Sequence, residues 1–277
     1  MHNTGLSFER NMPTLSVRNI HKSFPNGDGG VTEVLGGVSF DLENGEFLSL
    51  LGTSGCGKTT LLKIIAGLLE PDKGEVLIDG EVVGPGHNKV GYIFQQESLF
   101  PWRTVRQNIE FGLEVAGVSL EERKSAVDRI IEIVRMQGLE DNYPHEISGG
   151  QARKTELARS LVVEPHILVS DEALSNLDAQ TRNYLQTEFL RIKDTIGTTV
   201  LFVSHNVDET VFMSDRILVM SNMPAKIIAE YEIDIPKPRT RTSPNCLSYR
   251  SKILDVLRKE QEKALEQETR LARPAAT

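Results

Sequence analysis

The chain has 277 residues, 39% of them hydrophobic and 25% charged, which suffices for one large domain or two modest ones with an ample core. Its formal net charge of −8 argues against nucleic acid as the main partner. No apolar run approaches the roughly 18–20 residues of a membrane span, and the first residues lack the layout of a signal peptide, so we expect a protein that stays in the cytosol.

The first elements along the chain are predicted to be strands. After a loose leader at residues 1–13, residues 14–24 alternate apolar and polar side chains, as a strand does. Residues 34–52 predict two further strands joined by a hairpin turn at Asn44-Gly45. A smaller hairpin is predicted around the turn Asp79-Gly80.

The stretch GTSGCGKT, residues 52–59, follows an apolar strand and precedes a predicted helix, which is the context of a phosphate loop. Its glycines let backbone N–H groups turn toward a triphosphate, Lys58 reaches the β- and γ-phosphates, and the Thr59 hydroxyl ligates Mg²⁺. A chance match in a chain of this length has odds on the order of one in a hundred. We therefore predict that the chain binds a nucleotide.

Helical periodicity begins near Thr104 and continues to about Gly138. Within this block, Ser119 followed by Glu122 predicts a capping box at the start of a helix. The buried face of that helix is expected to consist of Val127, Ile130, Ile131 and Val134.

Residues 145–160, HEISGGQARKTELARS, predict a second helix whose start suits an anion. The serine and two glycines at 148–150 let backbone N–H groups point outward, and the helix dipole favours negative charge there. The chain therefore carries two phosphate-binding patterns about ninety residues apart, which poses the question of why it needs both.

A buried strand is predicted at ILVSDE, residues 167–172. Asp171 ends it, so its carboxylate is expected beside the phosphate loop, where it can hold Mg²⁺ directly or through water. Glu172 follows, at a position where it can orient and deprotonate an attacking water. An acidic pair alone also fits a strand end at a solvated loop, and the phosphate loop upstream favours the catalytic interpretation.

The remaining elements alternate up to a C-terminal tail. Helices are predicted at 177–197 and 208–215, and strands at 198–205, 216–221 and 225–235. The tail contains a weakly amphipathic helix over residues 247–271. This alternation predicts an α/β core with an inserted helical subdomain. Cys56 and Cys246 provide neither a disulfide framework nor a metal-ligand spacing, so we expect two reduced thiols.

With these motifs in order, residues 15–221 resemble the ATP-binding cassette (ABC) ATPases, the motor subunits of ABC transporters. YIFQQ supplies Gln95 as the family's Q-loop glutamine, ISGGQ supplies its signature with Ile147 in place of leucine, and SNLD supplies Asp178 of the D-loop. VSH supplies the switch histidine, His205, and Phe24 lies where the family stacks an aromatic ring on adenine.

Each of these residues also has a plainer interpretation. Gln95 can be an ordinary loop residue, His205 a structural residue at a strand end, Phe24 a core residue, and Asp178 a helix cap. Their joint occurrence in the family's order, rather than any single residue, favours the functional interpretation.

The resemblance implies an α/β fold with a P-loop NTPase core, an antiparallel β subdomain and an inserted α-helical subdomain at about 96–160. The implied divisions are a leader at 1–13, an ATPase domain at 14–240 and a helical tail at 241–277. The implied ligands are ATP and Mg²⁺.

The resemblance also implies the roles of individual residues. The implied catalytic residues are Lys58, Gln95, Glu172 and His205, and the implied Mg²⁺ ligands are Thr59, Gln95 and Asp171. The implied nucleotide contacts are Phe24, Gly52, Thr53, Ser54, Gly55, Cys56, Gly57, Lys58, Thr59, Thr60, Ser148, Gly149, Gly150, Gln151 and Asp178.

In this family two subunits pack head to tail, and each ATP lies between one subunit's phosphate loop and the other's signature. This implies a homodimer in which Ser148–Gly150 contact the γ-phosphate bound to the partner, and it explains the two patterns. ATP would bridge the subunits, and hydrolysis would remove the bridge.

Several positions depart from the family's usual pattern. Arg153, Lys154 and Glu156 stand in less usual places after the signature, Ser170 precedes Asp171, and Ala173 replaces a common proline. None removes a catalytic group, so the departures bear on the rate of ATP hydrolysis more than on ATP binding.

A single cassette resembles prokaryotic importer subunits, whose membrane domains are separate chains. SLFPWRTVRQNI, DETVFMSDRILVMS and EIDIPKPR resemble the nitrate/sulfonate/taurine group. The group implies permease subunits, a periplasmic or lipid-anchored solute-binding protein, and a peripheral location on the cytoplasmic face of the membrane. Phe100, Pro101 and Trp102 are expected to contact the permease, although Trp102 can equally be core.

Other functions are compatible with parts of the pattern. A non-transport cassette protein would use the same clamp on a soluble or nucleic-acid partner, but it often carries two cassettes in one chain. A P-loop kinase or GTPase needs neither the signature nor His205, and an exporter is disfavoured by the group-level resemblance. The transported solute and the role of the tail are not encoded in any motif of this chain.

Overall fold

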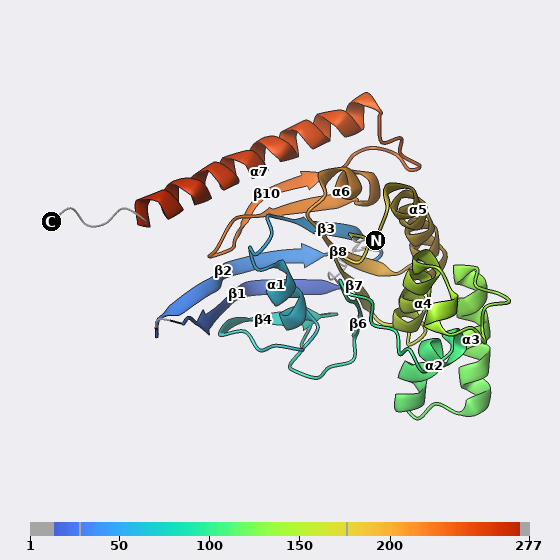
Figure 1. Ribbon diagram of the computed structural model, residues 1–277. Coiled ribbons are helices and arrows are strands. Elements are labelled where there is room, and N and C mark those ends of the chain that lie inside the picture. Colours follow the sequence, from blue (N-terminus) through green and yellow to red (C-terminus); the bar gives the residue numbers. More distant parts are fainter. Residues whose placement is uncertain (1–13, 28, 176, 272–277) are drawn as a thin grey trace, which may run out of the picture.

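The computed structural model describes residues 14–27, 29–175 and 177–271. It contains two β-sheets, with several helices grouped at one side and others packed on the sheets (Figure 1). The leader predicted at 1–13 lies outside the described residues. The elements belong to the mixed α/β class, as the sequence predicts. Within the described ranges, no helix is both long and apolar enough to cross a membrane.

The smaller sheet has four antiparallel strands in the order β2-β1-β4-β5. These strands are β1 (Leu15–Pro25), β2 (Val31–Leu42), β4 (Lys73–Ile78) and β5 (Glu81–Val82). The hairpin predicted at Asp79-Gly80 is confirmed, because β4 and β5 pair across it and both turn residues have positive φ.

The larger sheet has six strands in the order β10-β9-β3-β8-β7-β6. They are β3 (Phe47–Leu51), β6 (Val90–Ile93), β7 (Ile167–Asp171), β8 (Thr199–Ser204), β9 (Arg216–Met220) and β10 (Ile227–Glu232). All pairs are parallel except β9 with β10. The carboxyl ends of β3, β6, β7 and β8 therefore meet at one edge, where ligands bind in open α/β sheets.

The hairpin predicted at Asn44-Gly45 is wrong. The chain does turn there, with the Glu46 N–H donating to the carbonyl of Glu43, but β2 and β3 enter different sheets. All five residues of β3 are buried, and β3 pairs in parallel with β8 and β9 on its two sides. A strand buried on both faces is more stable at the centre of a parallel sheet than in a two-stranded hairpin.

Helices α2 (Val105–Val115), α3 (Leu120–Val134) and α4 (Gly149–Leu161) lie together at one side of the molecule (Figure 1). A short 3-10 helix, η1 (Pro144–Glu146), precedes α4. The predicted capping box of Ser119 and Glu122 is confirmed at the start of α3. The four apolar residues predicted for its inner face are all buried. The other helices are α1 (Lys58–Ile65), α5 (Ala179–Ile196), α6 (Val207–Met213) and α7 (Pro244–Leu271).

Three clusters of buried apolar side chains hold these layers together. One joins the two sheets to α1, a second joins the larger sheet to α2–α5, and a third lies beneath α6 and α7. Cys56 and Cys246 are both buried free thiols.

Candidate functional site

The phosphate loop connects β3 to α1 at the carboxyl edge of the larger sheet. Gly57 caps α1 with a φ of 106°, and a side chain there would also collide with Val34 and Leu35. Lys58 Nζ donates to the carbonyls of Gly52 (2.9 Å) and Thr53 (2.8 Å), so the lysine folds back over the loop. The Cys56 side chain is buried beneath the loop, and burial raises the pKa of its thiol.

Asp171 lies at the end of β7, facing the first turn of α1. The Thr59 hydroxyl donates to its Oδ1 (3.2 Å), and the Tyr92 hydroxyl donates to its Oδ2 (2.9 Å). Burial raises the pKa of Asp171, and the two hydrogen bonds partly offset this effect. A carboxylate and a hydroxyl at this distance form a set of hard oxygen donors that suits a magnesium ion.

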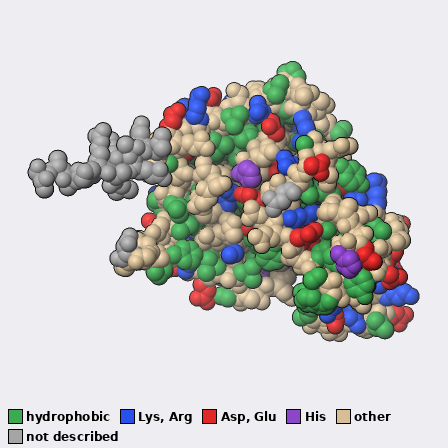
Figure 2. Space-filling model, viewed as in Figure 1, with side chains coloured by type: hydrophobic (Ala, Val, Ile, Leu, Met, Phe, Trp, Pro, Cys, Tyr) green, Lys and Arg blue, Asp and Glu red, His purple; other side chains and the backbone are tan. Residues whose placement is uncertain are grey.

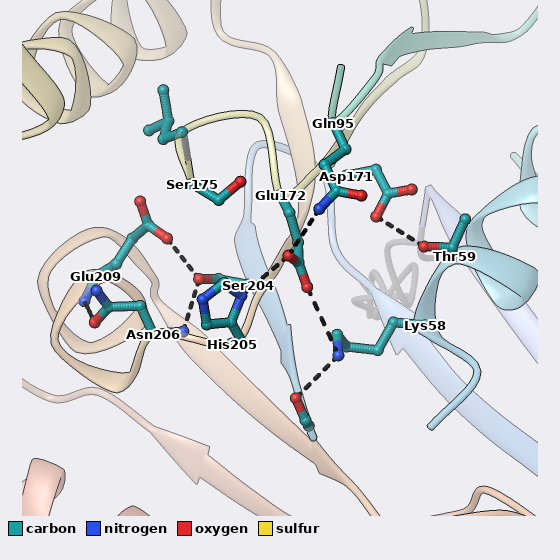
Figure 3. A network of polar contacts seen from close by, with 12 residues as sticks. Lys58, Thr59, Gln95, Asp171, Glu172, Ser175, Ser204, His205, Asn206 and Glu209 are labelled. Atoms are coloured by element: carbon teal, nitrogen blue, oxygen red, sulfur yellow. Dashed lines mark hydrogen bonds and ion pairs between the residues drawn. The ribbon is translucent and has the colours of Figure 1, made fainter. Parts of the chain in front are cut away.

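Glu172 lies at the centre of the polar network in Figure 3. Its Oε2 lies 3.0 Å from His205 Nδ1 and accepts from Gln95 Nε2 at 3.4 Å, and its Oε1 is 3.8 Å from Lys58 Nζ. Glu172 has a φ of 48°, in the left-handed region that costs a residue with a side chain about 1–3 kcal/mol. The structure thus brings three distant parts of the sequence to the carboxylate of a residue whose backbone is strained.

The cleft around this network is lined by seven of the fifteen residues predicted to contact the nucleotide. Its walls include Phe24, Ser54, Gly55, Gly57, Lys58, Thr59, Thr60, Gln95 and Glu172. Val34 and Met223 also line it, and no motif had indicated either of them. Phe24 is 37% exposed at the end of β1, so the alternative that it is a core residue is wrong.

The ISGGQ residues lie in a different cleft of the same chain. This second cleft is lined by Ser148, Gly149, Gly150, Gln151 and Asp178, together with Arg135, Lys154 and Tyr184 among others, and it shares no residue with the phosphate-loop cleft. Ser148 caps α4 and forms a capping box with Gln151. Asp178 caps α5 by accepting from the N–H groups of Gln180 and Thr181. Hydrogen bonding from the Thr181 side chain, together with these N–H groups, lowers the pKa of its carboxyl.

The unusual residues after the signature form a buried ion pair. Arg153 and Glu156, 8% and 1% exposed, are joined by a hydrogen bond of 2.6 Å. Arg153 also donates to the carbonyls of Phe94 (3.1 Å) and Gln95 (2.7 Å), and Glu156 accepts from the Ser98 N–H (2.5 Å). The pair therefore fixes the backbone on both sides of Gln95 to α4.

Two supporting residues were not found from the sequence. Tyr92 resembles a core residue of a short strand, and only the pairing of β6 with β7 brings its hydroxyl to Asp171. Glu209, buried in α6, accepts from Ser204 (2.5 Å) and from Gln186 (2.7 Å) directly behind His205 (Figure 3). Its spacing of four residues from His205 is the one signal that could have indicated it.

Trp102 is 71% exposed, so the alternative that it belongs to the core is wrong. Its ring lies 5.6 Å from that of Phe100, which in turn packs against Phe111 of α2. Asn108 donates to and accepts from the backbone of Phe100, which fixes this segment on α2. Figure 2 shows hydrophobic side chains gathered over the same corner of the molecule.

Comparisons with known proteins agree with this geometry. Residues 35–175 match the family described as ABC transporter. An uncharacterised ABC transporter ATP-binding protein of Methanocaldococcus jannaschii is 46% identical, covering 91% of this chain and 94% of its own length. An aliphatic sulfonates import ATP-binding protein of Bacillus cereus is 43% identical, covering 87% and 94% respectively.

Among solved structures, the fold is similar to that of an ATP-binding cassette determined as a dimer in a post-hydrolysis state, bound to ADP and phosphate. The TM-score is 0.69 at 26% identity, and the match covers 80% of this chain and all of the other.

Proposed function

This chain belongs to the family of ABC transporter ATPases, and we propose on that premise that it hydrolyses ATP to power import of a small anionic or organic solute through a separate permease. A sulfonate is the first solute to test, given the relative in Bacillus cereus. A solute-binding protein would deliver it, and the chain would sit on the cytoplasmic face of the membrane through its contact with the permease.

The observation that carries the proposal is that the phosphate loop and the ISGGQ signature line two separate clefts of one chain. Lys58 lines one and Ser148 lines the other, with no residue in common. Two copies packed head to tail would place one cleft of each kind around every nucleotide. ATP can then hold the copies together only while its phosphates are intact, because a ligand shifts an equilibrium only by its differential affinity for the two states.

Within the phosphate-loop cleft the residues divide the chemistry. Lys58 would bind the β- and γ-phosphates, and Thr59, Asp171 and Gln95 would hold Mg²⁺, which supplies charge neutralisation at the phosphates. Glu172 has a free lone pair on a carboxylate that His205 and Gln95 hold in position, as a general base requires.

The experiment that tests this function is a change of Glu172 to Gln. This variant keeps the shape of the side chain but removes its charge and basicity, so ATP should be bound without hydrolysis. We expect a stable dimer at saturating ATP and Mg²⁺, measured by light scattering, and a loss of turnover of about 10²–10⁴-fold. Lys58→Ala is the matched control and should stay monomeric, whereas a monomeric Glu172→Gln at saturating ATP would contradict the proposal.

The permease contact is proposed for the segment that carries Phe100, Pro101 and Trp102. Aromatic residues at the centre of an interface commonly contribute about 2 kcal/mol each, or roughly a thirtyfold change in affinity. Trp102→Ala should therefore reduce recovery of the chain with membranes that contain its permease, while ATP affinity stays unchanged. Leu120→Ala, at an equally exposed position of the same helical group, is the control. Equal recovery of both variants would exclude this contact.

Purification of the complex from native membranes would identify the permease and the binding protein. Binding of candidate solutes to that binding protein would then name the solute, and failure to bind sulfonates would exclude that class.

A further inference from the structure

The turn between β9 and β10, residues 221–226, forms part of the wall of the nucleotide cleft. Met223 lines the cleft together with Phe24 and Val34. Ala225 joins the turn to β2, because its N–H donates to Val34 (2.9 Å) and its carbonyl accepts from Gly36 (3.0 Å). A shift of this turn would therefore also move β2 at Val34, which lines the same cleft as the phosphate loop.

Asn222 in this turn forms hydrogen bonds to both the phosphate loop and the helix α7. Its Oδ1 accepts from the hydroxyl of Thr53 in the phosphate loop (2.6 Å). Its Nδ2 donates to the backbone carbonyl of Glu260 in α7 (2.8 Å). The two ends of one amide thus link the phosphate loop to the C-terminal helix.

The buried stripe of α7 leads directly to this contact. Up to residue 264, the part of α7 whose side chains are described, the buried residues are Cys246, Ile253 and Glu260, at a spacing of seven and 3%, 0% and 7% exposed. Such a spacing places them on one face. Cys246 and Ile253 belong to the apolar cluster beneath α6 and α7, and Figure 1 shows α7 running along the outer side of β10.

We propose that Asn222 is a positioning residue through which the docked helix α7 holds the phosphate loop in its nucleotide-binding conformation. The inference rests on the proposed binding of ATP and assigns a role to the C-terminal tail. Backbone N–H groups of a phosphate loop bind well only when they are already oriented, since ordering a loop on binding reduces affinity. Release of α7 would remove the hydrogen bond between Asn222 and the Glu260 carbonyl. Asn222 would then hold the Thr53 hydroxyl, and with it the phosphate loop, less firmly in position.

The first test compares ATP affinities of full-length variants at the phosphate-loop side. Asn222→Leu removes both hydrogen bonds at similar volume and should raise the Kd for ATP about tenfold, the equivalent of one hydrogen bond. The turnover number at saturating ATP should change less than the KM. Thr53→Val should weaken ATP binding as well, and the double variant should be no weaker than the weaker of the two single variants. Additive effects of the two changes would overturn the proposal.

The second test loosens α7 from a distance. Ile253→Asp introduces a charge into the buried stripe, whereas Leu254→Asp places it at the next position, which is 39% exposed. Amide hydrogen exchange reports whether α7 is released. A released α7 with a Kd for ATP raised about tenfold, and no further increase when Asn222→Leu is added, supports the link. A released α7 with unchanged ATP affinity overturns it.

If Ile253→Asp fails to fold, the cycle between Thr53 and Asn222 still tests whether Asn222 positions the phosphate loop, and additive effects there overturn the proposal. Failure of the wild-type chain to bind ATP would count against the proposed function itself. Wild-type binding that is lost in Lys58→Ala but unchanged in Asn222→Leu would count only against this inference.

Discussion

Tyr92 is the residue of the site whose chemistry depends most on its surroundings. Burial and the neighbouring Asp171 raise the pKa of its hydroxyl far above the usual range, so the hydroxyl remains a donor to Asp171 at every physiological pH. The ring lies 4.5 Å from that of Phe94. Tyr92 therefore orients the carboxylate proposed to hold Mg²⁺ without contacting the metal itself.

Changing Tyr92 to Phe should keep the ring packing and remove only this hydrogen bond. Loss of such a supporting bond typically lowers metal affinity about 10–100-fold. We expect the Mg²⁺ concentration for half-maximal ATP hydrolysis to rise by about that factor, with the ATP affinity measured without metal unchanged. A magnesium dependence equal to that of the wild type would show that Tyr92 is only a packing residue.

Glu209 predicts a pH dependence of stability. Burial raises the pKa of its carboxyl above the ordinary value of 4.5, against the opposing hydrogen bonds from Ser204 and Gln186. The folded state therefore binds this proton more tightly than the unfolded state. Any stability that Glu209 contributes is fully present below pH 4.5 and is lost as the pH rises through the raised pKa.

Glu209→Gln removes this titration. The free energy of unfolding of the variant, relative to wild type, should increase as the pH rises from below 4.5 and then become constant. Urea unfolding at a series of pH values measures this difference. A difference that does not vary with pH would contradict the assignment.

At the level of elements, the sequence predicts most strands and helices of the two sheets because their apolar periodicity is local. The hairpin at Asn44-Gly45 was wrong because a turn signal does not specify which strands pair, and β3 finds its partners about 150 residues away in β8 and β9. The four-residue strand β6 was not predicted, since so short a run has no readable period.

The same reasoning explains what could be predicted of the site. Lys58, Asp171 and Glu172 belong to sequence motifs whose residue types indicate their chemistry. They lie close together because β3 and β7 end at the same edge of the larger sheet. Asn222 and Met223 could not be found, because only the turn between β9 and β10 brings Asn222 to the phosphate loop and Met223 to the cleft.

The pairing of Arg153 with Glu156 gives an element-level prediction. Removal of one member of a buried ion pair leaves a buried charge and typically costs about 3–5 kcal/mol. Arg153→Met should therefore lower the free energy of unfolding by about that amount, and the double change of Arg153→Met with Glu156→Leu should lower it less. Both variants should hydrolyse ATP more slowly, since Gln95 loses its support from α4. A double variant as unstable as the single one would contradict this account.

At the level of the whole molecule, the chain presents one cleft around Lys58 and another around Ser148, on surfaces that share no residue. A second copy related by a twofold axis would complete both clefts at once, so the assembly closes at two chains rather than growing further. The segment between β6 and α2, which carries Trp102, and the helix α7 lie on different parts of the fold (Figure 1).

The placement of Lys58 and Ser148 in different clefts also has a consequence for dimers made of two different variants. Consider a mixed pair in which one chain carries Lys58→Ala and the other Ser148→Arg. One active centre then collects both lesions, and the other is assembled from undamaged halves. When a single chain carries both lesions beside a normal copy, each centre contains one lesion and neither is whole. A mixed dimer isolated by a different tag on each chain should therefore hydrolyse ATP in the first arrangement and not in the second.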